Sequence, residues 1–207
     1  MTVSLADVHI QLIDIDVELV EAWRVAFQSV EQVSVHHGSI FSVQGDAIVS
    51  PANSFGYMDG ALDLRLSEFF GWDLEKRLRK RLVEEFDGEL PVGQALLVPT
   101  YHDAYTWLVS APTMRVPMSV ETTANAYLAF RAILRAIREH NGTHESPIRS
   151  LVCTGLGTGV GCIPPKRCAK QMRYAYDVCV RGKVLTMGGL AEAARNHMNL
   201  IDYESPK

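Results

Sequence analysis

The sequence predicts an α/β fold with a mixed, largely parallel central sheet between layers of helices. Short apolar runs alternate along the chain with segments whose apolar residues recur every three or four positions, which are the patterns of buried strands and amphipathic helices. Alternation of strands and helices favours parallel strands joined by helical connections. With 207 residues, of which 47% are hydrophobic, the chain can bury one sizeable core, so we expect a single domain over 1–207.

The first half of the chain contains three short apolar runs and two helical regions. Helical spacing follows the first run, with Val20, Trp23 and Phe27 on one side. A second helical region continues from Leu62 to Phe86, and Gly71 divides it into two helices. The sequence thus predicts strands at 8–13, 33–35 and 46–50, a helix at about 20–30, and two helices between 62 and 86.

The second half repeats the alternation. Two strand-like runs are separated by Pro99 and a polar turn, so we expect them to be neighbours in the sheet. Asn141 and Gly142 follow a strong helical pattern and predict its end. The predicted elements are strands at 94–98, 106–110 and 148–153, helices at 123–138 and from about 166, and an additional C-terminal helix at about 186–201.

Composition and charge argue against several classes of protein. A net charge of -4 and a pI near 6.0 give no overall basic footprint for nucleic acid. The basic run 76–81 lies on the outer side of an amphipathic pattern and is expected to be a solvated surface. No segment has the roughly 18 consecutive apolar residues of a membrane helix, and the first residues do not form a secretory signal, so we expect a cytoplasmic protein.

Four cysteines fall in the last third of the chain, at Cys153, Cys162, Cys168 and Cys179. No C-x-x-C pair occurs, and the histidines are not at zinc-ligand intervals from them. We therefore expect free thiols, with no metal and no cofactor.

Two unusual loops follow predicted strands, at Ser50–Asp63 and Gly155–Gly161. In an open α/β sheet, ligands bind at the carboxyl ends of the strands. The second loop has glycines at alternate positions, which lets its N–H groups approach a phosphate, although a tight turn alone would also explain them. It is neither a P-loop nor a G-x-G-x-x-G motif.

The first loop carries polar side chains suited to a sugar or to catalysis. Asn53 offers an amide donor and an acceptor, and Asp59 and Asp63 add carboxylates beside the start of a helix. The alternative is structural, with Asn53 forming a local turn and one aspartate capping the helix. For Asp59 we favour the cap.

The stretch Asp46-Ala-Ile-Val-Ser-Pro-Ala-Asn53, followed by a small-residue loop and a helix, and later by Gly157-Thr-Gly-Val-Gly161, resembles the macrodomain family of ADP-ribose-binding modules. The resemblance covers roughly residues 33–179. It implies a three-layer α/β/α macrodomain fold, and ADP-ribose or an ADP-ribosylated macromolecule as the partner.

The resemblance also assigns roles to individual residues. Asn53 matches the residue that contacts the distal ribose, and Asp63 matches an acid implicated in removing mono-ADP-ribose, so both are candidate catalytic residues. The stretch Gly38-Ser39-Ile40 matches the turn that reads adenine. The remaining expected ligand contacts are Gly60, Ala61 and Leu62 in the first loop, and Gly157, Thr158, Gly159, Val160 and Gly161 in the second.

Three positions depart from the family pattern. Ser39 replaces an aspartate that reads the adenine amine, so we expect adenine binding either to be weaker or to use Asp46 or a neighbouring group. Gly161 and Cys162 stand where the family usually has an aromatic residue that stacks on the distal ribose, and Ala61 stands in a loop that is usually richer in glycine. Outside the motifs, Arg115 is either an anion contact or the partner of an acidic neighbour, and we favour the ion pair.

The resemblance leaves the activity open. An enzyme would hydrolyse an ADP-ribosyl linkage, or the terminal phosphate of ADP-ribose-1″-phosphate in Appr-1″-p processing, with a water activated by Asp63. The alternatives are a binding module without catalysis and a scaffold that has lost the ligand.

Overall fold

One central sheet organises the computed structural model, which describes residues 3–183 and 188–202. Within those residues the sheet has six strands in the order β2-β1-β6-β3-β5-β4. Their bounds are β1 His9–Asp14, β2 Val33–His37, β3 Ala47–Ser50, β4 Leu96–His102, β5 Tyr105–Ser110 and β6 Ser150–Cys153.

Most of the strand pairs are parallel. β1 pairs in parallel with β2 and β6, and β3 does so with β5 and β6, while β4 runs antiparallel to β5. The mixed, largely parallel sheet expected from the sequence is confirmed, as is the pairing of the two strands around the turn after Pro99. Because β1, β2, β3, β5 and β6 point the same way, the loops after them meet at one edge.

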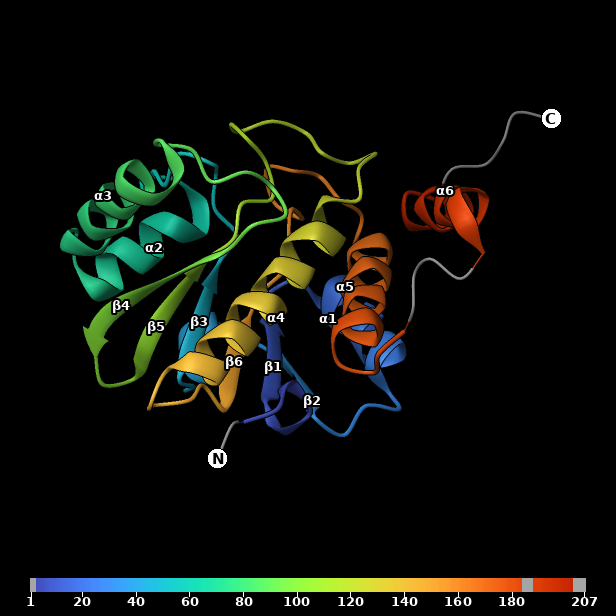
Figure 1. Cartoon of the computed structure of the whole chain (residues 1–207), viewed down its shortest axis with the longest axis horizontal. Coiled ribbons are helices and arrows are strands. Elements are labelled where there is room, and N and C mark those ends of the chain that lie inside the picture. Colours follow the sequence, from blue (N-terminus) through green and yellow to red (C-terminus); the bar gives the residue numbers. More distant parts are fainter. Residues whose placement is uncertain (1–2, 184–187, 203–207) are drawn as a thin grey trace.

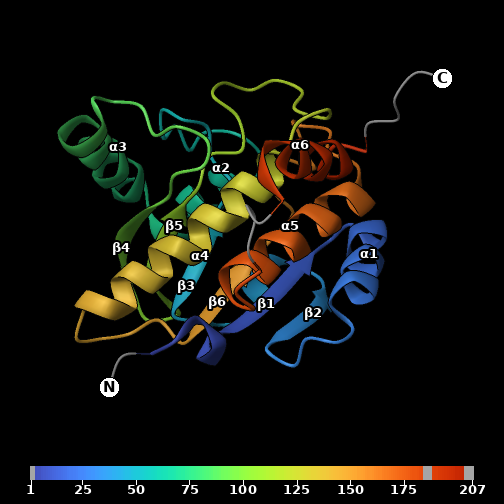
Figure 2. The same ribbon diagram turned by 45° about the vertical axis from the view of Figure 1, so that its right-hand side comes forward.

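Helices cover both faces of the sheet, as Figures 1 and 2 show. α1 (Val17–Phe27), α4 (Asn125–Thr143) and α5 (Pro165–Cys179) pack on one face, and α2 (Ala61–Phe70) and α3 (Asp73–Phe86) on the other. Two short 3-10 helices, η1 (Leu5–Asp7) and η2 (Ile40–Ser42), precede β1 and β3. The three-layer α/β/α fold is therefore confirmed.

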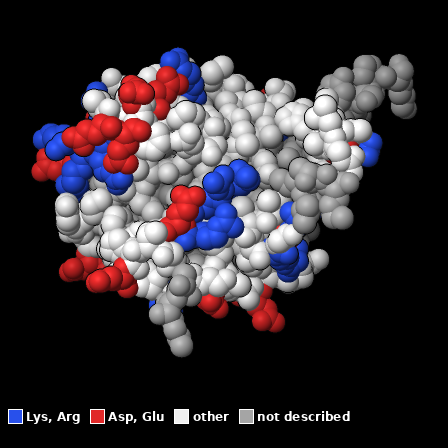
Figure 3. All heavy atoms as spheres, viewed as in Figure 1, with Lys and Arg blue, Asp and Glu red and all other residues white. Residues whose placement is uncertain are grey.

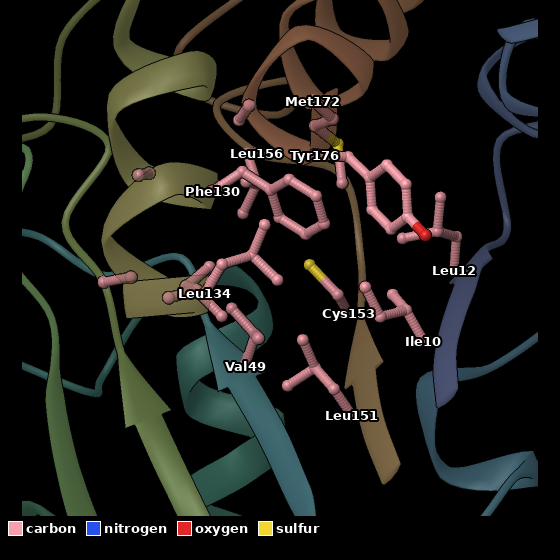
Figure 4. Close-up of a cluster of buried hydrophobic side chains, with 14 of the residues drawn as sticks. Ile10, Leu12, Val49, Phe130, Leu134, Leu151, Cys153, Leu156, Met172 and Tyr176 are labelled. Carbon is pink, nitrogen blue, oxygen red and sulfur yellow. The ribbon is translucent and has the colours of Figure 1, made fainter. Parts of the chain in front are cut away.

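Alternating side chains of the strands divide the core between the two faces. In β6, Leu151 and Cys153 point to the side of α1, α4 and α5, whereas Val152 packs on the side of α2 and α3. Figure 4 shows the first of these clusters, where Phe130 of α4 and Tyr176 of α5 meet the strand residues. This two-faced burial explains why the central strands are continuously apolar in sequence.

The end of α4 corrects one prediction. Asn141 and Gly142 do not stop the helix, which continues to Thr143. The Asn141 side chain is buried, donates to the Ile148 carbonyl at 2.8 Å and accepts from the Ile148 N–H at 2.8 Å. Tertiary contacts to the chain before β6 therefore outweigh the local tendency of Asn-Gly to end a helix.

The basic run on α3 is a solvated, paired surface, as predicted. Leu74, Leu78 and Leu82 are buried beneath it. Figure 3 shows acidic and basic atoms intermixed over this helix. The ion pairs are Lys76–Asp73, Arg79–Glu75, Lys80–Glu84 and Arg81–Glu85.

A last helix, α6 (Gly189–Leu200), packs beside α5. Gln171 of α5 donates to the Leu200 carbonyl at 2.9 Å, and Asp202 accepts from Arg167 and Lys170. Of the helix predicted at about 186–201, residues 186 and 187 lie outside the described residues. None of the helices in the described ranges is long and apolar enough to cross a membrane.

Candidate functional site

A cavity of about 790 Å³ lies at the edge of the sheet where the parallel strands end. It runs from the ends of β2 and β1, past the end of β6, to the loops after β3 and β5. The structure brings together every residue that the family motifs nominate for catalysis or ligand binding. These are Ser39, Ile40, Asn53, Gly60, Ala61, Leu62, Asp63, Gly157, Thr158, Gly159, Val160 and Gly161.

The lining of the cavity changes along its length. The end at β1 and β2 is largely apolar, with Ile13, Ile15, Ile40 and Phe41. The loop after β6 supplies glycines to the middle. The loops after β3 and β5 supply Asn53, Asp63 and Thr113 to the other end. This order suits an elongated ligand that has a flat apolar end, an anionic middle and a polar, hydroxyl-bearing end.

The glycine loop after β6 is held through its carbonyl oxygens. The carbonyls of Gly157, Gly159 and Gly161 accept from the N–H groups of Ile163, Cys162 and Val120 at 2.9, 3.0 and 2.8 Å. The loop N–H groups can therefore serve an anion without breaking these hydrogen bonds.

Crowding in this loop also explains why it carries no aromatic residue. Gly157 has a φ of +72°, where side chains are strained. A Cβ atom at Gly161 would lie 2.5 Å from the Gly157 carbonyl oxygen, which is closer than any real contact. Position 161 therefore has no room for a side chain, and this loop cannot supply the aromatic ring that the family usually places there.

Asp14 lines the cavity and stabilises the neighbouring loops through hydrogen bonds. It was not identified as a site residue from the sequence. Its Oδ2 accepts from the Thr154 hydroxyl at 2.5 Å and from the Gly155 N–H at 3.0 Å, and its Oδ1 accepts from the Asp16 N–H at 3.0 Å. These hydrogen bonds join the ends of β1 and β6. An acid directly after the apolar run of the first strand was the available signal.

Asn53 forms the local turn that was the structural alternative for it, and it also lines the cavity. Its Oδ1 accepts from the N–H groups of Phe55 and Tyr57 at 3.0 and 3.3 Å, and its Nδ2 donates to the Tyr57 carbonyl at 2.8 Å. Because an amide nitrogen has two hydrogens, one donor is left over for a ligand.

The start of α2 corrects the prediction for Asp59. The N-cap of α2 is Gly60, and no side chain caps the helix. Asp59 instead is exposed and lines the cavity beside Asp63. Ala61, the first residue of α2, has a φ of 48°, in the left-handed region that is costly for a residue with a Cβ atom. This strain falls where the first loop meets the cavity.

Asp63 is a buried carboxyl group in the first turn of α2. Burial raises its pKa to about 6, the Ser50 hydrogen bond opposes this rise, and the negative charges of Asp59 and Glu75 add to it. The Ser50 hydroxyl donates to Asp63 Oδ1 at 2.5 Å. Near neutral pH, Asp63 can therefore accept a proton at the polar end of the cavity.

The structure excludes Asp46 as a cavity contact. This residue precedes β3, at the opposite edge of the sheet, where its Oδ2 accepts from the N–H groups of Arg149 and Ser150. Arg115 forms the predicted ion pair, with two bonds to Glu89 at 2.7 and 2.9 Å. It also lies over the Phe55 ring, 5.0 Å from its centroid.

Further cavity residues come from segments that no local motif marks. Met114 follows β5, and its backbone forms a bridge with Asn53 that ties the two loops together. Arg65 lies one turn into α2. Only the tertiary arrangement brings these residues to the site, whose lining also includes Asp14, Ile15, Phe41, Tyr57, Thr113, Pro117 and Thr154.

Residues 3–183 and 188–202 contain no group of three or more His, Cys, Asp or Glu side chains that could hold a metal ion. The four cysteines are free, with Cys153 and Cys168 buried. Burial raises the pKa of the Cys168 thiol to about 12.

Comparison with protein families and curated proteins gives consistent matches. The family model described as Macro domain matches residues 49–172. An uncharacterized protein of Aquifex aeolicus is 29% identical over 140 residues, which cover 68% of this chain and 78% of that protein. A second uncharacterized protein, from Aeropyrum pernix, is 27% identical over 151 residues, with 73% of each chain covered.

Solved structures of macrodomains share the fold. The Oceanobacillus iheyensis macrodomain with ADP has a TM-score of 0.59 at 16% identity, covering 80% of this chain and 89% of that one. A mutant of that macrodomain with ADPR has a TM-score of 0.60 at 13% identity, covering 98% and 99%. The macrodomain of Mycobacterium tuberculosis DarG has a TM-score of 0.58 at 20% identity, covering 69% and 88%.

The raised pKa of Asp63 predicts a pH-dependent stability difference for Asp63→Asn. Between pH 4 and 6 the folded state binds a proton that the unfolded carboxyl, with a pKa of 3.8, has released, so the wild-type free energy of unfolding falls as pH rises. The asparagine of the variant does not titrate, so the free energy of unfolding of Asp63→Asn does not fall in this way. Urea unfolding should show Asp63→Asn gaining up to about 3 kcal/mol relative to wild type between pH 4 and 7.5. An unchanged difference across this range would contradict the assignment.

Proposed function

The chain belongs to the Macro domain family, and from this premise we propose that its cavity binds ADP-ribose or a close derivative. The observation that carries the proposal is the convergence of all the expected contact residues on one elongated cavity. Its volume of about 790 Å³ lies in the range of sites for ligands of this size. Macrodomains of similar fold have been solved with ADP and with ADPR, which agrees with the proposal.

The proposed ligand lies along the edge of the sheet. Its base occupies the apolar end at β1 and β2, where Ile13, Ile15 and Ile40 offer flat contacts. Its diphosphate lies between the 157–161 loop and the N-terminus of α2, where backbone N–H groups favour negative charge. Its distal ribose then reaches Asn53, whose remaining N–H can donate to a hydroxyl.

Tyr57 is an aromatic residue of the cavity lining whose backbone is hydrogen-bonded to Asn53. It lines the cavity from the first loop, its side chain is exposed, and the guanidinium of Arg79 lies over its ring at 4.3 Å. We propose that this ring supplies the apolar surface that Gly161 cannot. The stacking contact thus comes from the loop after β3 in place of the loop after β6.

We propose a hydrolytic step at the anomeric carbon of the distal ribose. Asp63 accepts a proton from a water molecule, the water oxygen forms a bond to the anomeric carbon, and the bond to the ADP-ribosylated acceptor breaks. The acceptor leaves with the bonding electron pair and takes up a proton from solvent. ADP-ribose-1″-phosphate would lose its terminal phosphate by the same attack.

A binding module without catalysis is the second candidate. The observation that favours it is the burial of Asp63, only 9% exposed and bonded to Ser50, so that a nucleophilic water must approach through the cavity. In that case the Ser50–Asp63 hydrogen bond would serve to fix the start of α2 beneath the ligand.

We also propose a domain organisation, a cellular compartment and a partner for the protein. All the strands in the described ranges belong to one sheet, and α6 packs on α5, which supports one domain over 1–207. Free cysteines are typical of a reducing compartment, so we propose a cytoplasmic protein whose partner is an ADP-ribosylated macromolecule.

Calorimetric titration with ADP-ribose tests the binding proposal. We expect a micromolar Kd, roughly -8 kcal/mol. Asn53→Ala should weaken binding at least about tenfold because it removes the ribose donor and loosens the loop. Asn199→Ala, which changes an exposed asparagine on α6, is the matched control and should bind as wild type does. Absence of heat with the wild-type protein would refute the proposal.

Hydrolysis assays separate the enzyme from the binding module. With ADP-ribosylated protein and with ADP-ribose-1″-phosphate, Asp63→Asn should lower turnover at least about 100-fold and leave the Kd for ADP-ribose within a few-fold. The wild-type rate should fall below pH 6 as Asp63 is protonated. In Ser50→Ala, loss of the hydrogen bond should move this fall to higher pH. Wild-type protein that binds ADP-ribose but hydrolyses neither substrate is a binding module.

A further inference from the structure

The apolar end of the cavity is poor in groups that accept a hydrogen bond. Asp14 is the carboxylate at this end, and its oxygens already accept from Asp16, Thr154 and Gly155. Ser39, which caps η2, accepts from the Phe41 N–H at 3.3 Å, so its hydroxyl proton is free to donate. An exocyclic amine on a bound base would therefore meet no carboxylate without hydrogen-bond partners here, only the lone pairs left on Asp14 Oδ1 and the Ser39 oxygen.

Arg65 brings a cation to the same end. Leu62, Arg65 and Phe69 follow one another at three- and four-residue spacing and so share one face of α2. The Phe69 ring stacks on the Phe41 ring with centroids 4.6 Å apart, which turns this face toward η2. Leu62, Arg65 and Phe41 all line the cavity.

The Arg65 guanidinium is available to a ligand. Its side chain is 71% exposed, and its Nη1 atom forms an ion pair with Glu68 Oε2, one turn away, at 3.5 Å. Exposed pairs of this kind contribute little to stability, so a ligand can replace the contact at small cost. A guanidinium only donates hydrogen bonds, and its planar fork matches two acceptors side by side.

Purine bases differ in the group at position 6, next to N7, and Arg65 can distinguish these groups by hydrogen bonding. Hypoxanthine and guanine present adjacent acceptors, O6 and N7, which arginine binds with two hydrogen bonds. Adenine presents N7 beside an amine donor, which glutamine or asparagine matches and arginine does not. The donors of Arg65 and Ser39 thus complement a 6-oxopurine better than adenine.

We infer that the base end of the cavity accepts a 6-oxopurine at least as well as adenine, with Arg65 and Ser39 as the specificity-determining residues. The inference rests on the proposed function, since it takes the ligand to be a nucleoside diphosphate ribose whose base lies at the end formed by β1 and β2. The inference extends the proposed function from adenine to other purine bases. The substrate class becomes purine nucleoside diphosphate riboses, without selection for adenine.

Calorimetry with ADP-ribose and with its hypoxanthine analogue, inosine diphosphate ribose, tests the inference because the two ligands differ only in the base. The wild-type protein should bind the hypoxanthine ligand at least as tightly as ADP-ribose, and about tenfold more tightly if both hydrogen bonds to Arg65 form. Tighter binding of ADP-ribose would overturn the inference and leave the proposed function intact. Failure of both ligands to bind would overturn the proposed function, and the inference with it.

Two variants assign the effect to residues. Arg65→Gln should shift the affinity ratio about tenfold toward ADP-ribose, because glutamine can pair with the amine and N7 of adenine. Ser39→Asp should also favour ADP-ribose, and aspartate keeps the cap of η2. Arg24→Gln is the matched control, since Arg24 forms an exposed pair with Glu21 on α1, away from the cavity. An affinity ratio unchanged in Arg65→Gln and Ser39→Asp would contradict the assignment.

Discussion

Five neighbouring strands of the sheet, from β2 to β5, run parallel, and the loops after them all open at one edge. The site depends on this constraint because none of these loops could form a cavity alone. The loop after β6 lies between those after β1 and β3, so glycines occupy the middle of the cavity. The apolar end of the cavity lies at β1 and β2, on one side of β6, and the polar end lies at β3 and β5, on the other side.

Buried hydrogen bonds turn these neighbouring loops into a fixed surface. Asp14 joins the ends of β1 and β6 through Thr154 and Gly155, and Ser50 joins the end of β3 to Asp63 in α2. Both use carboxylates, which form stronger hydrogen bonds than neutral acceptors do. The cost of burying Asp63 appears as its raised pKa. Burial at the start of α2 therefore gives this acid a pKa suited to proton transfer, and the hydrogen bond from Ser50 limits how far the pKa rises.

The sequence predicts the fold and the two loops because their signals are local. Strand and helix periods fix the element order, and Asn53 and the glycines of 157–161 occur within short motifs. Phe41 and Arg65 escape prediction because the packing of α2 on η2 brings them together across the chain. Two local rules also mislead. Gly60 starts α2 without a side-chain cap, so Asp59 is free to line the cavity, and the buried hydrogen bonds of Asn141 carry α4 past Asn-Gly.

The central claim is that one ligand spans the cavity from the apolar end to Asn53. A crystal structure of the protein with ADP-ribose tests it most directly. The account predicts the base beside Phe41 and Arg65, the diphosphate within hydrogen-bonding distance of the N–H groups of 157–161, and the distal ribose between Asn53 and Tyr57. A ligand bound in the reverse direction, or outside this cavity, would contradict the account.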